Sequence, residues 1–236
     1  IMRRKILKDG ATTIRRSFSE PEALGAELLA GVRAHLGEDF DVETHFKPDY
    51  RPWRQRLAVV PDGDMFKAMK RGEASVVTDR IARFETGGIR LESGDLLEAD
   101  IIVTATGFDL CAMGDIAMAV DGRALELSKT WTHRGILFSG VPNLAWTFGY
   151  LRTSWTMRAN LVSEFVCRLL GRMDEGGARM VTPALREQDR QMEPKPFITD
   201  DNFNAGYIMR GVGIMPMQGD ELPWVMTQDY TIDKDE

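Results

Sequence analysis

The sequence predicts an α/β protein, and three of its segments lead to that fold class. Residues 73–107 read as short strands joined by tight turns, and they run into an apolar segment at residues 101–103. An antiparallel meander that feeds one apolar strand is typical of α/β or α+β proteins and not of helical bundles. An amphipathic helix is then predicted from Thr153 or Ser154 to about Leu170.

The apolar segment and its exit are the most informative part of the chain. Ile101, Ile102 and Val103 follow one another without alternation, which is typical of a strand covered on both faces. Four small residues follow at 104–107, and Gly107 allows a turn with positive φ. In doubly wound sheets, ligands bind outside the carboxyl ends of strands. The segment is therefore either a ligand-binding strand exit or a buried strand with a tight turn.

The first part of the chain is expected to hold helices and a long loop. Ser19 is predicted to be the N-cap, or part of the cap region, of a helix that stops at Gly37. Prolines preclude a continuous helix over residues 40–64, which we interpret as a loop. Asp64 is expected to cap a short helix over residues 65–70.

The strands and the later helix are predicted from turn signals and periodicity. Strands are expected at residues 74–78, 80–85, 88–92, 100–106 and 135–139, with a hairpin around Asp121 and Gly122. The later helix has one apolar stripe, and Arg158 is expected to lie off it. The stripe consists of Leu161, Val162, Phe165, Val166, Leu169 and Leu170. Residues 176–236 are expected to be an irregular tail over the body.

Composition excludes several classes of function. The chain has 236 residues, 43% of them hydrophobic, and a net charge of −6, which argues against broad binding of nucleic-acid phosphates. It contains no membrane-spanning apolar run and no secretory signal pattern. Cys111 and Cys167 lie far apart without a metal-binding motif, so neither a zinc site nor a redox dithiol is expected. A reducing, cytoplasmic location fits this cysteine usage.

The chain has no glycine-rich phosphate-binding loop, either of the G-x-G-x-x-G or of the Walker type. It also begins with Ile1. If the strand exit at 104–107 binds a cofactor, the loops that hold its phosphates are expected upstream. We therefore expect that the N-terminal part of the same polypeptide is missing and that it completes the protein.

Several motifs in fixed order resemble those of flavin-containing monooxygenases of the Baeyer–Villiger type. The matching segments cover roughly residues 40–175 and lie at residues 45–57, 61–66, 99–109, 140–150 and 154–170. The resemblance implies a flavoprotein with two dinucleotide-binding domains, of which this chain is the C-terminal half. Residues 1–104 would end the NADP-binding domain, residues 105–175 would end the FAD-binding domain, and residues 176–236 would be the tail.

The resemblance also implies a reaction. FAD and NADPH would be the cofactors, and one oxygen atom from O₂ would be inserted into a ketone or added to a sulfide. Arg56, next to Gln55, matches the position of an active-site arginine that faces both cofactors. A guanidinium in a site closed to water stabilises developing negative charge, although this arginine also reads as one of several in a solvated loop.

The resemblance places the remaining cofactor contacts at two positions. Ala105, Thr106 and Gly107 would lie against the flavin ring. Tyr150, Thr153, Ser154 and Trp155 would bring a helix N-terminus to its pyrimidine edge, where backbone N–H groups suit an electron-rich ligand. Ordinary capping by Thr153 or Ser154 would explain those hydroxyls equally well.

Two other functions stay open at this point. A different two-domain flavin oxidoreductase could pass hydride without activating oxygen. The chain could also be a non-catalytic interaction module that folds by itself. We expect the isolated 236 residues to retain FAD weakly or not at all, because they lack phosphate-binding loops.

Overall fold

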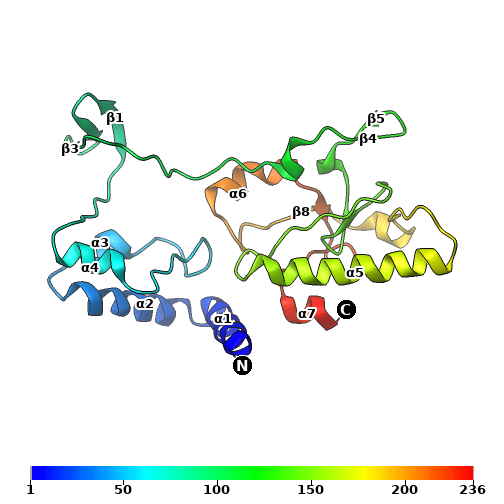
Figure 1. Ribbon diagram of the computed structural model, residues 1–236, viewed down its shortest axis with the longest axis horizontal. Coiled ribbons are helices and arrows are strands. Elements are labelled where there is room, and N and C mark those ends of the chain that lie inside the picture. The colour runs from blue at the N-terminus through cyan, green and yellow to red at the C-terminus, as the bar shows by residue number, and fades with distance from the viewer. Residues whose placement is uncertain (1, 236) are drawn as a thin grey trace. The chain divides into compact units, whose positions relative to one another are not determined.

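The computed structural model describes residues 2–235 and the side chains of residues 8–235 (Figure 1). The chain divides into two compact units, residues 1–107 and residues 108–236. Each unit is described separately below.

The first unit begins with two consecutive helices, α1 (Met2–Ser19) and α2 (Pro21–Leu36). The predicted stop at Gly37 is confirmed, because this C-cap residue has a φ of 100°. The helix starts within the predicted cap region, but Glu20 and not Ser19 occupies its N-cap. Ser19 is the last residue of α1, and its hydroxyl donates to the Arg15 carbonyl over 3.3 Å. Pro21 begins α2 instead, since proline favours the first position of a helix.

Two short helices follow, α3 (Val42–Phe46) and α4 (Asp64–Lys70). The prediction of a loop over residues 40–64 is wrong for α3. The Asp41 carboxylate caps this helix by accepting a hydrogen bond of 3.0 Å from the Thr44 backbone N–H. The second helix lies where it was expected, but Gly63 rather than Asp64 occupies its N-cap.

The first unit ends in a three-stranded antiparallel sheet with the order β1-β2-β3. The strands are β1 (Ile81–Glu85), β2 (Gly88–Leu91) and β3 (Leu96–Glu98). The expected strands at 80–85 and 88–92 are confirmed, with Glu85 paired to Gly88 across the turn. Residues 74–78 form no strand, so that prediction is wrong. Their β propensity has no partner edge among the described residues.

The strand predicted at residues 100–106 is also absent from the described structure. Residues 101–103 carry no regular structure, and Ile101 and Val103 are 82% and 83% exposed. A strand buried on both faces needs neighbouring strands and covering helices. The described part of the first unit provides neither next to this segment, which explains why the prediction fails here.

The described residues of the second unit form three two-stranded antiparallel sheets. They are formed by β4 (Ala119–Val120) with β5 (Arg123–Ala124), β6 (Thr132–His133) with β7 (Leu137–Phe138), and β8 (Lys195–Pro196) with β9 (Met217–Gln218). The predicted hairpin is confirmed, because Asp121 and Gly122 both have positive φ, as a tight hairpin turn requires. The buried strand expected at 135–139 is confirmed at Leu137 and Phe138.

The helices of the second unit are α5 (Trp155–Glu175), α6 (Gly206–Gly211) and α7 (Tyr230–Asp235). Short 3₁₀ turns connect the other segments, namely η1 (Ala112–Asp115), η2 (Leu127–Lys129), η3 (Gln188–Gln191) and η4 (Val212–Ile214). Figure 1 shows α7 in red beside the long helix α5, with which it is in contact. The C-terminal residues therefore return to the helix predicted most clearly by the sequence.

The predicted helix over 154–170 is confirmed as α5, and it continues to Glu175. Val162 is buried with Ile136 and Leu137, and Phe165, Val166 and Leu169 pack against this cluster. Leu170 is 53% exposed, so the core stripe ends before it. Arg158 was expected to lie off the core and is instead 2% exposed.

Residues from the tail form much of the largest apolar cluster in the second unit. Phe148 and Leu151 pack there with seven residues that follow α5. These are Phe197, Ile198, Phe203, Ala205, Ile208, Met215 and Met226. The regular elements of the tail are short, and its apolar side chains are central to the packing of this cluster. The tail therefore holds the segment that precedes α5.

Candidate functional site

Gln55 and Arg56 lie in the first unit, in the segment between α3 and α4. Gln55 is half-buried and Arg56 is exposed. Nearby, the Arg51 guanidinium lies 4.0 Å from the centre of the Phe18 ring, and Trp53 has a φ of 63°. The side chains of this basic segment are thus partly ordered by contacts with α1.

Residues 105–107 lie at the end of the first unit and are exposed. Gly107 has a φ of 101°, so the predicted turn with positive φ is present. Nothing lies within 4 Å of a Cβ placed on Gly107. The glycine is therefore required by backbone conformation and not by a close neighbour among the described residues.

The structure brings Tyr150, Thr153, Ser154 and Trp155 together at the start of α5. Ser154 occupies the N-cap, but its side chain makes no capping hydrogen bond. Its hydroxyl instead shares a hydrogen bond of 2.7 Å with the Thr156 hydroxyl. The predicted cap position is thus confirmed at Ser154, but neither hydroxyl caps the helix, since Thr153 Oγ1 donates to Met157 Sδ over 3.7 Å. The first N–H groups of α5 thus have no acceptor from the cap side chain.

Trp155 is held at the mouth of α5 by a close approach to the backbone. A Cβ placed on Gly149 would lie 2.2 Å from carbon atoms of the Trp155 ring, so only glycine fits there. The Trp155 and Phe148 ring centres are 5.4 Å apart, and Phe148 also packs on Phe197. Trp155 is 47% exposed, which leaves part of the ring open to a ligand or a covering segment.

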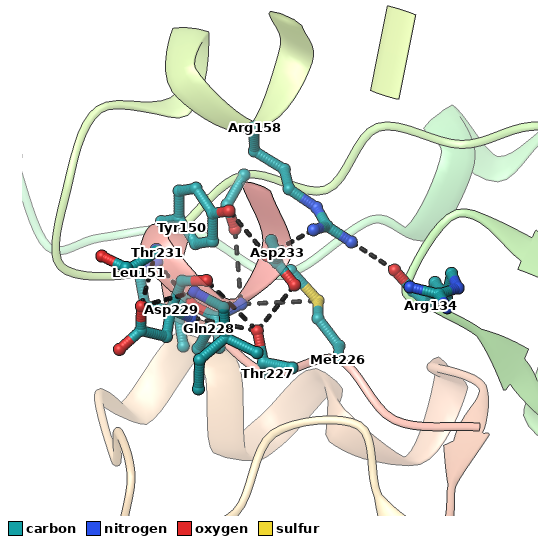
Figure 2. A network of polar contacts seen from close by, with 12 residues as sticks. Arg134, Tyr150, Leu151, Arg158, Met226, Thr227, Gln228, Asp229, Thr231 and Asp233 are labelled. Carbon is teal, nitrogen blue, oxygen red and sulfur yellow. Dashed lines mark hydrogen bonds and ion pairs between the residues drawn. The ribbon is translucent and has the colours of Figure 1, made fainter. Parts of the chain in front are cut away.

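A buried polar network lies directly behind this helix start (Figure 2). The Tyr150 hydroxyl donates to Asp233 Oδ2 over 2.6 Å. Arg158 forms an ion pair with the same carboxylate and also donates to the Arg134 carbonyl. Thr227 Oγ1 donates to the other oxygen of Asp233 over 2.7 Å. Both oxygens of Asp233 are therefore used, as a charge in a poorly solvated position requires.

Gln228 makes a second link between the tail and the start of α5. Its Oε1 accepts a hydrogen bond of 2.8 Å from the Leu151 backbone N–H. Its Nε2 donates to the Gly149 carbonyl over 3.5 Å. These two bonds flank Tyr150, so the tail contacts both the backbone and the side chain of the segment that leads into the helix.

The environment of Tyr150 shifts its ionisation. Burial raises the pKa of its hydroxyl above the ordinary value, and the adjacent Asp233 carboxylate raises this pKa further. The phenol therefore stays protonated and acts as a donor to Asp233. Tyr150 was predicted to bind the cofactor. Its side chain is fully buried, and its hydroxyl is engaged in this network.

Sequence reasoning missed Arg158, Asp233 and Gln228. Arg158 was read as solvent-facing because arginine on a surface helix usually is. The local signal that could have found it is its spacing, because Arg158 lies three and four residues before Leu161 and Val162, on the same helix face as the apolar stripe. Its partner Asp233 is 75 residues away in the chain, so no local pattern could pair them.

Two features are absent from the part of the chain that the structure describes, namely a metal-binding cluster and a membrane-spanning helix. Among residues 2–235, no three His, Cys, Asp or Glu side chains gather in a way that could hold a metal ion. None of the helices in that described part combines the length and the apolar character needed to cross a bilayer.

Comparisons with known proteins identify relatives of one kind. The chain is 43% identical to the FAD-containing monooxygenase EthA of Mycobacterium tuberculosis. This match extends over 213 residues, which are 90% of the chain. It is 40% identical over 218 residues to the probable FAD-binding monooxygenase AlmA of Acinetobacter baylyi. It is 41% identical over 213 residues to the putative FAD-containing monooxygenase MymA of Mycobacterium tuberculosis. These matches confirm the resemblance to flavin-containing monooxygenases.

The chain spans 42–43% of the length of these relatives. No family model matches it, and no solved structure matches it. Homology to FAD-containing monooxygenases thus rests on the sequence matches.

Proposed function

We propose that this chain forms part of an FAD- and NADPH-dependent monooxygenase. The enzyme would insert one oxygen atom from O₂ into a ketone, or add it to a sulfide. The observation that carries this proposal is the 39–43% identity to FAD-containing and FAD-binding monooxygenases across at least 90% of the chain. The organisation would be the one implied by the motifs, with residues 1–104 in the NADP-binding domain and residues 105–175 in the FAD-binding domain.

The start of α5 is the described surface that best fits a flavin. Its first N–H groups have no acceptor from the Ser154 side chain, and the positive end of the helix dipole favours an electron-rich group. Trp155 offers a partly exposed aromatic face beside these donors. In this proposal Thr153, Ser154 and Trp155 line the pyrimidine edge of the flavin, and Tyr150 supports them from the protein side.

The bound flavin would supply the electron-transfer and oxygen chemistry, and the protein would orient and polarise it. Arg56 would be the catalytic residue, with Gln55 beside it. A guanidinium keeps its charge at any physiological pH and stabilises negative charge that develops in a site closed to water. Ala105, Thr106 and Gly107 would let the backbone approach the flavin ring, since their side chains are small.

The proposal is tested by NADPH oxidation with the flavin-loaded enzyme that contains this chain. A panel of ketones and sulfides is supplied under ¹⁸O₂, and the products are analysed by mass spectrometry. We expect substrate-dependent NADPH oxidation and one labelled oxygen atom in an ester, lactone or sulfoxide. NADPH oxidation that passes hydride to an acceptor without labelled product would favour a flavin oxidoreductase of another type. A protein that binds no flavin would contradict the proposal altogether.

A further inference from the structure

We propose that the C-terminal segment 227–235 positions the flavin-facing start of α5, with Asp233 and Gln228 as its positioning residues. This inference rests on the function proposed above. Neither side chain lies at the helix start itself. Each acts through residues that do, because Gln228 binds the Leu151 N–H and Asp233 binds Tyr150 and Arg158.

The first step of the argument is that the tail fixes the approach to α5 from two sides. Gln228 bonds to the backbone on either side of Tyr150, and Asp233 bonds to its hydroxyl. The chain then turns through residues 152–154 into the first helical turn. Any displacement of α7 therefore moves the backbone that leads directly to Ser154 and Trp155.

The second step is that Arg158, which belongs to α5 itself, holds this helix against the tail. It lies in the second turn of α5, and its guanidinium joins the Asp233 carboxylate to the Arg134 carbonyl. A Cβ on Gly135 would lie 3.1 Å from Arg158 Nη2 and 2.8 Å from Met226 Cγ. The guanidinium thus lies between the backbone of Gly135 and the tail, and this position restricts the conformations that its side chain can adopt.

The third step concerns charge. Arg158 is 2% exposed, and a buried cation without a partner is strongly unfavourable. The network can therefore exist only when α7 is in place. The same Asp233 carboxylate binds Arg158 in the helix and Tyr150 in the segment before it, so it fixes the position of the helix relative to that segment. An ordered tail would then determine where the N–H groups of α5 point.

The test uses the flavin-loaded enzyme that contains this chain and four of its variants. Asp233→Asn removes the charge, and Gln228→Met removes the acceptor for the Leu151 N–H while keeping side-chain length. Gln228→Glu keeps that acceptor but loses the donor to the Gly149 carbonyl, so it serves as a partial rescue through the Leu151 bond alone. Asp235→Asn is the matched control, because it makes the same change at an exposed position of the same helix.

We measure the flavin dissociation constant, the visible absorption spectrum of the bound flavin, and hydrogen exchange of the amides at residues 151–158. In Asp233→Asn and Gln228→Met we expect about tenfold weaker flavin binding, since small misplacements of positioning groups have large effects. We also expect a shifted flavin spectrum and faster amide exchange. Asp235→Asn should behave like the unchanged enzyme, and Gln228→Glu should lie between Gln228→Met and the unchanged enzyme, because it keeps the Leu151 bond and loses the Gly149 bond.

Three outcomes are decisive. Normal flavin affinity and spectrum in both Gln228→Met and Asp233→Asn, even with a lower melting temperature, would show a merely structural role and overturn the inference. If Asp233→Asn does not fold, Gln228→Met decides the question, because it leaves the buried ion pair intact. If the unchanged enzyme binds no flavin, the proposed function itself fails, and this inference falls with it.

Discussion

Arg158 and Asp233 form an ion pair whose side chains are only 3% and 9% exposed, although 75 residues separate them in the chain. Such a pair fixes the position of its elements, here α5 and α7, because each charge loses its water shell and depends on the other. The stability of the second unit should therefore be unusually sensitive to the loss of either partner.

The first prediction concerns this sensitivity. Asp233→Ala leaves the Arg158 charge buried, so we expect the free energy of unfolding to fall by about 3–5 kcal/mol. Arg158→Met combined with Asp233→Ala should be less destabilised than Asp233→Ala alone, because the uncompensated charge is gone. Urea denaturation of the unchanged protein, Asp233→Ala, Arg158→Met and the double variant measures both effects. A double variant that is as unstable as the sum of the two single variants would contradict the coupling.

The second prediction concerns pH. Burial and the Asp233 carboxylate raise the pKa of Tyr150 in the folded protein above its ordinary value. In the unfolded chain, the same phenol ionises at about pH 10. Just above that pH, the phenol therefore keeps its proton in the folded protein and loses it in the unfolded chain. The stabilisation from this group is complete below about pH 10 and is lost as the pH rises through the folded pKa. Stability should therefore fall less steeply above that pH in Tyr150→Phe than in the unchanged protein.

Melting temperatures between about pH 9 and pH 12 test this expectation, a range chosen to span the ordinary ionisation of tyrosine. Tyr207→Phe is the matched control, since the structure gives Tyr207 no such buried carboxylate partner among the described residues. Parallel pH profiles for Tyr150→Phe and the unchanged protein would mean that Tyr150 ionises alike in both states.

The third prediction concerns the contact between Gly149 and Trp155. Gly149→Ala would place a methyl group 2.2 Å from the indole, so the ring must move. We expect a loss of about 1–3 kcal/mol, as for other overpacked sites, together with a change in tryptophan fluorescence. Adding Trp155→Ala should remove most of this penalty.

Gly171→Ala is the control for the change of glycine to alanine. Gly171 lies inside α5, and nothing lies within 4 Å of a Cβ placed on it. Alanine should stabilise the helix there by about 0.5–1 kcal/mol. Equal effects at positions 149 and 171 would indicate that backbone entropy, and not the Trp155 contact, determines the result.

The elements that could be predicted from the sequence are those with local signals. The α5 helix follows from its apolar spacing, and the β4–β5 hairpin follows from Asp121 and Gly122. The β1–β2 pair follows from alternation and its glycine turn. In each case, the residues that specify the element also form it, so no distant partner is needed.

The failures have a physical cause in common, which is dependence on distant groups. The apolar run at 101–103 predicts burial, but burial on both faces requires neighbours from elsewhere in the fold. Arg158 lies on the same helix face as Leu161 and Val162, but a buried arginine needs a partner, and Asp233 is 75 residues away in the chain. The tail lacks periodicity, yet its apolar residues fill the core because packing there needs volume and not regular structure.

The fourth prediction concerns flavin retention. The 236-residue chain has no glycine-rich loop for the cofactor phosphates, although the start of α5 offers donors for the ring. Because phosphate contacts account for much of dinucleotide binding at helix N-termini, the purified chain should retain little or no FAD. Its flavin content is measured by absorbance after gel filtration. Stoichiometric flavin in the purified chain would contradict this expectation.

The fifth prediction concerns Arg56 in the flavin-loaded enzyme that contains this chain. Arg56→Ala should lower product formation by about 10²–10³-fold, which is the usual effect of removing one group that stabilises developing negative charge. The exposed position of Arg56 predicts an unchanged melting temperature. Arg56→Lys keeps the charge but loses the planar guanidinium, so an intermediate rate would assign part of the effect to geometry.

Product formation and NADPH oxidation are followed in the same reaction, because they respond differently. If Arg56 acts on the oxygen-insertion step alone, NADPH is still consumed in Arg56→Ala, and hydrogen peroxide replaces the oxygenated product. If it also orients the nicotinamide, NADPH consumption falls as well. Normal product formation in Arg56→Ala would remove Arg56 from the mechanism and leave it as one of several arginines in a solvated loop.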